Sequence, residues 1–102
     1  MIRTVRDIAY ARAGDKGNIS NVCVWSFVPE DYSLLKFALT PERIKAAYPK
    51  LLRGRIHRYE MEHLHGLNLV LEDALEGGVN SSLNLDSHGK SWSFLILGMP
   101  LA

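Results

Sequence analysis

With 102 residues, of which 47% are hydrophobic, the chain has the size and composition of one globular domain, residues 1–102. The net charge of +1, from 12 basic and 11 acidic residues, argues against a nucleic-acid partner and against a strong binder of anionic membranes. The single cysteine, Cys23, excludes an internal disulfide, and neither a signal peptide nor an apolar run of the ~20 residues that span a membrane is present, so we expect a soluble cytoplasmic protein.

Two strands are predicted in the N-terminal part of the chain. Residues 4–11 alternate as a strand, and residues 19–28 form a stronger one. The second strand carries apolar side chains on both faces, for example Trp25 on one and Val24 on the other. A strand of this kind is typical of the middle of a sheet that is covered on two sides.

Helices and a third strand are predicted next. Residues 29–39 are expected to be helical, and a second helix begins after Thr40, which suits the N-cap, with Pro41 at the first helical position. Pro49 should end this helix. Residues 55–61 alternate as the third strand.

The C-terminal third is predicted to contain a helix and a hairpin. Residues 65–75 give the strongest helical pattern because leucines recur along one stripe, and the Gly-Gly pair at 77–78 suits a helix end. Residues 80–85 and 91–99 are predicted as two strands, with a turn signal at 86–89.

Five predicted strands with interspersed helices favour an α+β fold. We expect a mainly antiparallel five-stranded sheet with helices packed on one face, as in a ferredoxin-like sandwich. Since some strands are apolar on both sides, the face without helices should be an interface. Homo-oligomerisation is the commonest reason for such a face.

The charged segment 11–18 (ARAGDKGN) is the main candidate site, and we expect it to form a loop between the first two strands. In one interpretation it binds an anion: Arg12 and Lys16 supply charge, and Gly14 and Gly17 let backbone amides form a concave nest for a carboxylate or a coenzyme A phosphate. In the other it is a corner that satisfies itself, with Asp15 capping nearby amides and with Lys16 or Arg12 paired with Asp86 or another carboxylate. The tentative ligand-binding residues are Arg12, Gly14, Asp15, Lys16, Gly17, Asn18 and Asn68.

Three further features were weighed for chemistry. Asn68 lies between leucines of the predicted helix, so its amide either bonds to a neighbouring backbone group or shares a site with the charged segment. Cys23 is expected to be a small buried residue and not a catalytic thiolate. We predict no metal site and no cofactor, because the spacing is wrong for a chelate in the donor-rich stretch of His57, Glu60, Glu62, His63 and His65.

Several short motifs in register resemble one bacterial family, the ferredoxin-fold-like C-terminal domain of acyclic terpene utilisation protein A (AtuA). The resemblance covers nearly the whole chain. Two positions depart from the family pattern: Ala13 stands where Ser is usual, and Glu76 replaces the first glycine of a GGG run. The matching segments are 13–18 (AGDKGN), 58–60 (RYE), 67–71 (LNLVL), 74–79 (ALEGGV), 82–86 (SLNLD) and 89–90 (GK).

The resemblance implies a domain that is fused behind a much larger one or encoded beside it as a short protein. The larger proteins are associated with the breakdown of acyclic isoprenoids such as citronellol and geraniol through coenzyme A thioesters. Our leading hypothesis is a non-catalytic small subunit or assembly module that partners a larger AtuA-like protein, with homo-oligomerisation alongside. The alternatives are a small enzyme or binding module for a carboxylate or acyl-CoA at the charged segment, and a purely structural homo-oligomer.

Overall fold

The computed structural model describes residues 3–16, 19–73 and 90–101, and only the backbone at residues 15, 16, 90 and 91. In chain order its elements are η1 (Val5–Asp7), β1 (Ala9–Lys16), β2 (Ile19–Ser26), η2 (Pro29–Asp31), α1 (Tyr32–Ala38), α2 (Pro41–Ala47), β3 (Ile56–Met61), η3 (Glu62–Leu64), β4 (Gly66–Glu72) and α4 (Lys90–Leu97), where η marks a short 3-10 helix.

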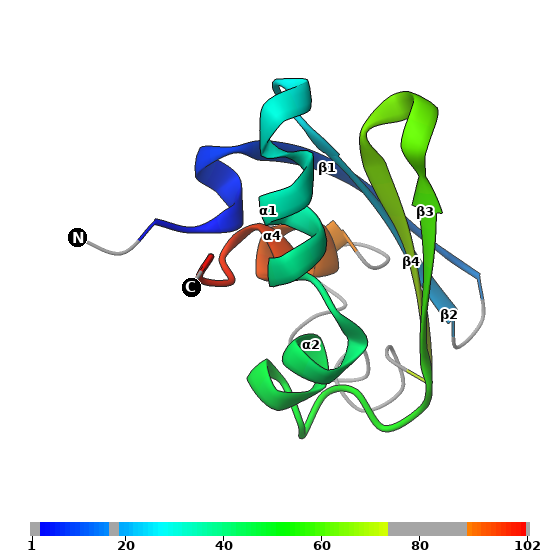
Figure 1. Ribbon diagram of the computed structural model, residues 1–102. Coiled ribbons are helices and arrows are strands. Elements are labelled where there is room, and N and C mark those ends of the chain that lie inside the picture. Colours follow the sequence, from blue (N-terminus) through cyan, green and yellow to red (C-terminus); the bar gives the residue numbers. More distant parts are fainter. Residues whose placement is uncertain (1–2, 17–18, 74–89, 102) are drawn as a thin grey trace.

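The strands form one antiparallel sheet in the order β1-β2-β4-β3. The described α-helices, α1, α2 and α4, lie on the same side of this sheet (Figure 1). The predicted α+β class, with an antiparallel sheet and helices on one face, is therefore confirmed. The predicted number of strands is wrong for the part of the chain that the structure describes, where the sheet has four strands and not five. One of the predicted strands, residues 80–85, lies outside the described residues.

The core lies between the sheet and the helices. Alternate side chains of β2 and β4 point into it, as the two-residue period of a strand requires. The helices contribute large apolar side chains that are fully shielded from water. Its principal members are Val22, Val24, Leu67, Leu69 and Leu71 from the sheet, and Leu35, Ile44, Trp92 and Ile96 from the helices.

The segment predicted as the last strand, residues 91–99, is mostly the helix α4. Trp92 and Ile96 are four residues apart and both are fully buried, whereas Phe94 between them is 68% exposed. A strand would place all three side chains on one face, and a helix separates them in the way observed. The segment is apolar at nearly every position, so the strand period and the helix period fit it equally well.

The segment predicted as the strongest helix, residues 65–75, contains the strand β4. This strand pairs with β2 on one side and with β3 on the other, so it is a central strand of the sheet. Leu67, Leu69 and Leu71 are buried at alternate positions, while Leu64, which the helical stripe had included, is exposed. Pairing on two sides outweighs the helix propensity of leucine here.

The first predicted strand begins later than expected. Residues 5–7 form η1, in which Asp7 Oδ2 accepts a hydrogen bond of 2.8 Å from the backbone N–H of Thr4. Val5, Ile8 and Ala9 are all buried, a spacing that a strand cannot produce. β1 then runs from Ala9 to Lys16, into the segment predicted as a loop.

The predictions for the middle of the chain are confirmed. Residues 29–38 are helical as η2 and α1, and Thr40 caps α2 by accepting a hydrogen bond of 3.2 Å from the N–H of Arg43. Tyr48 leaves the helical conformation directly before Pro49. The predicted third strand is β3.

The two ends of the described chain lie side by side. Thr4 and Pro100 form an isolated antiparallel bridge, and the N–H groups of Val5 and Leu101 donate to the carbonyls of Met99 and Arg3. This pairing places η1 and the end of α4 together beside β1. Within the described residues, no helix has the length and apolar character needed to cross a membrane.

Candidate functional site on the open face of the sheet

The side of the sheet that faces away from the helices is called the open face here. Its residues follow from the strand register and from the burial alternation along β2 and β4. They form three rows across the strands in the order β1, β2, β4, β3. The rows are Tyr10, Trp25, Gly66 and Met61; Arg12, Cys23, Asn68 and Tyr59; and Gly14, Asn21, Val70 and His57.

The charged segment predicted as a loop is mostly strand. Residues 11–16 belong to β1, and the pairing with β2 continues to the last pair, Lys16 with Ile19. Ala11 and Ala13 are half-buried against the core, while Arg12 and Gly14 are exposed on the open face. Gly, Asp and Asn favour turns, so the segment was predicted as a loop although its small and polar positions alternate as in a strand. Gly14 to Lys16 are therefore extended and not part of a concave nest.

The fold brings three of the predicted site residues to the same face. Arg12 pairs with Cys23, and Cys23 pairs with Asn68, so Arg12 and Asn68 lie in one row with a single strand between them. Gly14 lies in the next row. The side chains of Asp15 and Lys16, and the residues at 17 and 18, lie outside what the structure describes.

Arg12 is exposed and has no ion pair or hydrogen bond with any described residue. The alternative interpretation paired a cation of this segment with a carboxylate, for which residue 86 was the first choice; that residue is not described. With no partner among the described residues, its guanidinium offers five N–H donors at the open face. Asn21 and Asn68 add amide groups on the same face.

Asn68 contacts a side chain and not the backbone group that its predicted helical position had suggested. The thiol of Cys23 lies 3.7 Å from Oδ1 of Asn68 and 3.9 Å from Oδ1 of Asn21. Both contacts are long and weak; the first joins the neighbouring strands β2 and β4, and the second lies within β2. Asn68 is tolerated because it stands on the open side of a strand, where its amide is half-exposed.

The thiol of Cys23 is poorly suited to nucleophilic attack. Burial raises its pKa above the ordinary value, because removing water disfavours the charged thiolate. The thiolate is the reactive species, so the raised pKa disfavours nucleophilic attack by Cys23. This agrees with the expectation that it is a small packing residue.

An aromatic cluster formed by Tyr10, Trp25 and Phe27 stands at one end of the open face. The ring of Tyr10 stacks on Trp25 with centroids 5.2 Å apart and on Phe27 with centroids 5.6 Å apart. Tyr10 is 47% exposed and Phe27 is 60% exposed. The sequence placed Trp25 and Phe27 on one face, but Tyr10 joins them only through the register of β1 and β2.

His57 and Glu72 form a second polar feature at the opposite end of the open face. His57 Nε2 and Glu72 Oε2 are 2.6 Å apart, and both side chains are partly exposed. The sequence had grouped His57 with the donors that follow it in the chain. Its actual partner comes from β4, which could not be identified while residues 65–75 were predicted to be helical.

Two other donors of residues 57–65, Glu62 and His65, contact side chains of α1. Glu62 lies 3.6 Å from Lys36 and accepts a hydrogen bond of 3.4 Å from Tyr32, while the ring of His65 contacts the ring of Tyr32 edge-on. The pKa of Glu62 is lowered, chiefly by a hydrogen bond with the side chain of Glu60. Among the described residues, no three His, Cys, Asp or Glu side chains are grouped so that they could hold a metal ion.

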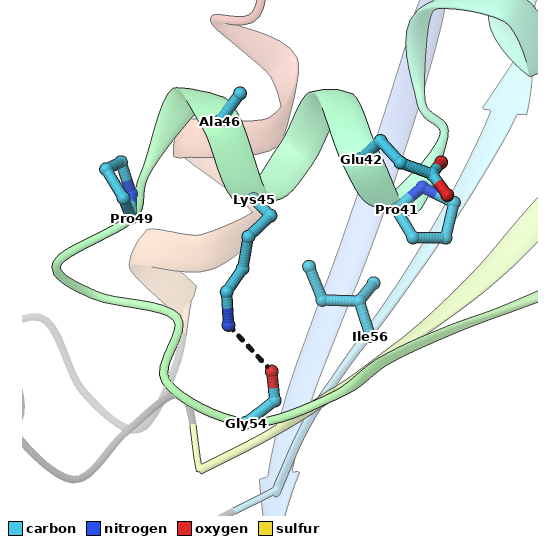
Figure 2. Close-up of a pocket in the computed structure, with 7 residues that line it drawn as sticks. All are labelled: Pro41, Glu42, Lys45, Ala46, Pro49, Gly54 and Ile56. Atoms are coloured by element: carbon cyan, nitrogen blue, oxygen red, sulfur yellow. Dashed lines mark hydrogen bonds between the residues drawn. The ribbon is translucent and has the colours of Figure 1, made fainter.

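A groove of about 580 Å³ lies elsewhere, between α2 and the start of β3 (Figure 2). Lys45 extends from α2 toward Gly54 and donates a hydrogen bond of 2.9 Å to its carbonyl. Of the predicted site residues whose side chains the structure describes, none lines it. The lining residues are Pro41, Glu42, Lys45, Ala46, Pro49, Gly54 and Ile56.

The described part of the open face is thus a flat mixture of stacked aromatics, an unpaired cation and amide groups. Such a surface can bind another surface by contact and hydrogen bonding. It does not assemble a nucleophile, a base and an enclosed pocket, which a reaction on a small molecule would need.

Comparison with known proteins gives one match. The family model described as the AtuA ferredoxin-like domain matches residues 3–102. No curated protein and no solved structure matches the chain. Since the match covers nearly the whole sequence, the chain belongs to the AtuA ferredoxin-like domain family.

Proposed function

We propose that this domain is a non-catalytic docking module, a small subunit or assembly module that binds a larger AtuA-like protein through the open face of its sheet. The observation that carries the proposal is the location of the aromatic cluster. Tyr10, Trp25 and Phe27 stand together on the side of the sheet that the described helices leave uncovered. A group of exposed aromatic side chains on one face of a small domain is typical of an interaction surface.

The composition of the face supports a protein partner. Binding energy at interfaces concentrates in a few aromatic and arginine side chains surrounded by polar groups. The open face provides the aromatic cluster, Arg12 with no partner among the described residues, and amides at Asn21 and Asn68. The partner surface should therefore offer an apolar recess for the aromatic rings and an acceptor for Arg12.

The chemistry of the face argues against a catalytic role. Burial raises the pKa of the Cys23 thiol, which disfavours the reactive thiolate. The described groove lies beside α2 and away from Arg12 and Asn68. On this proposal the larger protein supplies the chemistry, in bacterial breakdown of acyclic isoprenoids through acyl-CoA thioesters in the cytoplasm, and this domain supplies binding.

Co-expression with the larger AtuA-like protein of the same organism tests the proposal. We expect the two chains to co-elute in size-exclusion chromatography, and we expect Tyr10→Ser/Phe27→Ser to abolish the association. Phe37→Ser is the matched control, because Phe37 is similarly exposed but lies on α1, on the helical side. Absence of association at micromolar concentration, or wild-type association of the double variant, would overturn the proposal.

A ligand-binding role is the second candidate, and Arg12 favours it. Its guanidinium has no described partner, and Arg12 shares the open face with Gly14 of the same strand and with Asn68 two strands away, so a carboxylate or an acyl-CoA phosphate could bind there. Calorimetric titration with coenzyme A and with a short branched carboxylate tests this role. Saturable binding that Arg12→Ala removes would favour it over docking, and no heat at millimolar ligand would exclude it.

A further inference from the structure

The outer edge of β3 carries backbone groups that no described residue uses. In the described sheet, β3 is the last strand on its side and pairs with β4 alone. The N–H of Glu72 donates to the carbonyl of Arg55 at 2.9 Å, so Arg55 and every second residue after it turn their backbone groups toward β4. The residues between them turn theirs outward, and these are Ile56, Arg58 and Glu60.

This edge lacks the common features that prevent further strand pairing. Edge strands are often protected by proline, by lysine or by a bulge. β3 contains neither proline nor lysine, and its register with β4 is regular from Ile56 to Met61. Arg58 donates hydrogen bonds to the end of α1 and pairs with Glu60 at 3.0 Å. An added strand would therefore meet a regular ladder whose charged side chains already have partners.

The groove beside α2 lies next to the same edge. Ile56 belongs to both, because its side chain lines the groove while its backbone groups point outward (Figure 2). Residues that stand directly opposite each other on paired strands project to the same face of the sheet. A residue opposite Ile56 on an added strand would therefore direct its side chain to the helical side, where the groove lies. Apolar atoms predominate in the lining, including those of Pro41 and Ala46, so an apolar side chain suits the groove.

The charges around this end of β3 favour an acidic residue beside that apolar one. Among the described residues here, basic side chains outnumber acidic ones, and none of the basic ones has an ion pair with a described residue. Glu72 stands across from Arg55 but is held by His57 at 2.6 Å, so Arg55 remains available. The basic residues are Lys45, Lys50, Arg53 and Arg55, and the acidic ones are Glu42, Glu72 and Asp73.

We propose that the outer edge of β3 is a site for β-strand addition, and that its occupant is an extended peptide segment of another protein in which an acidic residue follows an apolar one. The segment runs antiparallel to β3, as the neighbouring strands of the sheet do, with the apolar residue opposite Ile56 and the acidic residue opposite Arg55. Main-chain hydrogen bonds supply the affinity, and the groove selects the side chain. The proposal goes beyond the proposed function, because it uses the edge of the sheet and not the open face.

A capped peptide of the sequence Thr-Thr-Val-Thr-Leu-Glu, titrated into the isotopically labelled chain, tests the proposal by nuclear magnetic resonance. In the proposed register its leucine lies opposite Ile56. We expect saturable binding at about millimolar concentration or below, and slower exchange of the amide protons of Ile56, Arg58 and Glu60. The amides of Ala11 and Ala13, which point outward from β1, are the internal reference and should exchange at unchanged rates.

Two N-methylated peptides separate strand addition from simple filling of the groove. A methyl group on the leucine nitrogen removes the N–H that donates to the carbonyl of Ile56, and it should weaken binding at least about tenfold. A methyl group on the nitrogen of the preceding threonine is the matched control. That N–H points away from β3 in the proposed register, so binding should be little changed.

A pair of variants on α2 tests the role of the groove. Ala46→Trp should weaken binding of the peptide at least about fivefold by occupying the groove. Ala47→Trp is the control, because it adds the same ring at the next exposed position of α2, which does not line the groove. It should bind the peptide as the wild type does.

Three results would overturn the proposal: no saturation at about 10 mM peptide, equal effects of the two methylated peptides, or unchanged binding by Ala46→Trp. The open-face variant Tyr10→Ser/Phe27→Ser should still bind the peptide, because both substitutions lie away from the outer edge of β3. Failure of this proposal and failure of the proposed function are therefore distinguishable.

Discussion

The indole of Trp25 lies directly over Gly66 of the neighbouring strand. A Cβ atom at position 66 would stand 2.5 Å from Cδ1 of Trp25 and 2.8 Å from the carbonyl oxygen of Val24. The contact lets Trp25 lie across β4 while its other side stacks on Tyr10 at 5.2 Å. Gly66 thus sets the position of the whole aromatic cluster.

Gly66→Ala should destabilise the protein, because the added methyl group meets backbone and an indole that is held by Tyr10. We expect a loss of about 1–3 kcal/mol in the free energy of unfolding, measured by urea denaturation, together with a shift in tryptophan fluorescence. Gly14→Ala is the matched control. It should be neutral or stabilising by up to about 1 kcal/mol, because its Cβ has free space. Equal effects at the two positions would contradict this explanation of the glycines.

Arg58→Ala should destabilise the protein by removing the hydrogen bonds that join β3 to the end of α1. The guanidinium of Arg58 donates hydrogen bonds of 2.6 Å to the carbonyl of Lys36 and 3.4 Å to that of Leu39, which are acceptors at the end of α1, and it pairs with Glu60 at 3.0 Å. We expect a loss of about 2 kcal/mol, measured by denaturant unfolding, because a charged donor to these carbonyls disappears. Arg53→Ala, at an exposed position without such bonds in the described structure, should change stability by less than about 0.5 kcal/mol. A similar loss for both variants would show that Arg58 has no such role.

Trp92→Phe should cost little despite the complete burial of Trp92. Among the described residues, no group accepts a hydrogen bond from its Nε1, and a buried donor without a partner costs about 1–3 kcal/mol. Phenylalanine removes this donor and can keep the edge-on contact with Tyr48 at 5.8 Å. We expect a loss under about 1.5 kcal/mol by thermal or urea unfolding, against about 3–5 kcal/mol for Trp92→Ala. If the two variants lose the same amount, the indole N–H has an acceptor.

The protein should lose stability in alkali through Tyr32 and Tyr48. Burial is the main cause that raises the pKa of both phenols above the ordinary value, and nearby carboxylates raise that of Tyr32 further. A group whose pKa is raised in the folded state contributes its full stability below the unfolded pKa and loses it as the pH rises through the folded pKa. Both hydroxyls also donate to backbone carbonyls, those of Gly66 and Leu95.

We therefore expect the free energy of unfolding to fall as the pH rises above about 10, the unperturbed tyrosine pKa. Unfolding by urea at a series of pH values measures it. Tyr32→Phe/Tyr48→Phe should flatten this alkaline decline while it lowers stability at neutral pH. An unchanged decline in the double variant would assign the alkaline loss to other groups.

The sequence was informative where local chemistry decides the structure. The cap at Thr40 and the proline at position 41 located the start of α2, and Pro49 located its end, because each residue acts through its own backbone. The motifs that resemble the AtuA family also identified the family from local residues alone. Residues whose roles are set by distant partners were harder to interpret.

The wrong predictions of secondary structure arose in segments whose apolar residues fit both the two-residue period of a strand and the 3.6-residue period of a helix. Leu67, Leu69 and Leu71 alternate as a strand, but Leu64, Leu67 and Leu71 also fall on one helical stripe. Only pairing with β2 and β3 decides between the two. The same ambiguity affected residues 91–99. The site could be predicted in part: Arg12, Gly14 and Asn68 were named, but their shared face, the aromatic cluster and the His57–Glu72 pair depend on strand register, which one sequence does not specify.

The central claim is that a protein covers the open face, and hydroxyl-radical footprinting of the assembled protein tests it most directly. Oxidation of Tyr10, Phe27 and Tyr59 is compared between the assembled state and a dilute monomer, with Phe37 and Phe94 on the helical side as internal references. We expect the three open-face residues to become protected on assembly while the two references react at unchanged rates. Protection confined to Phe37 and Phe94, or no protection of any of the five in a confirmed assembly, would contradict the claim.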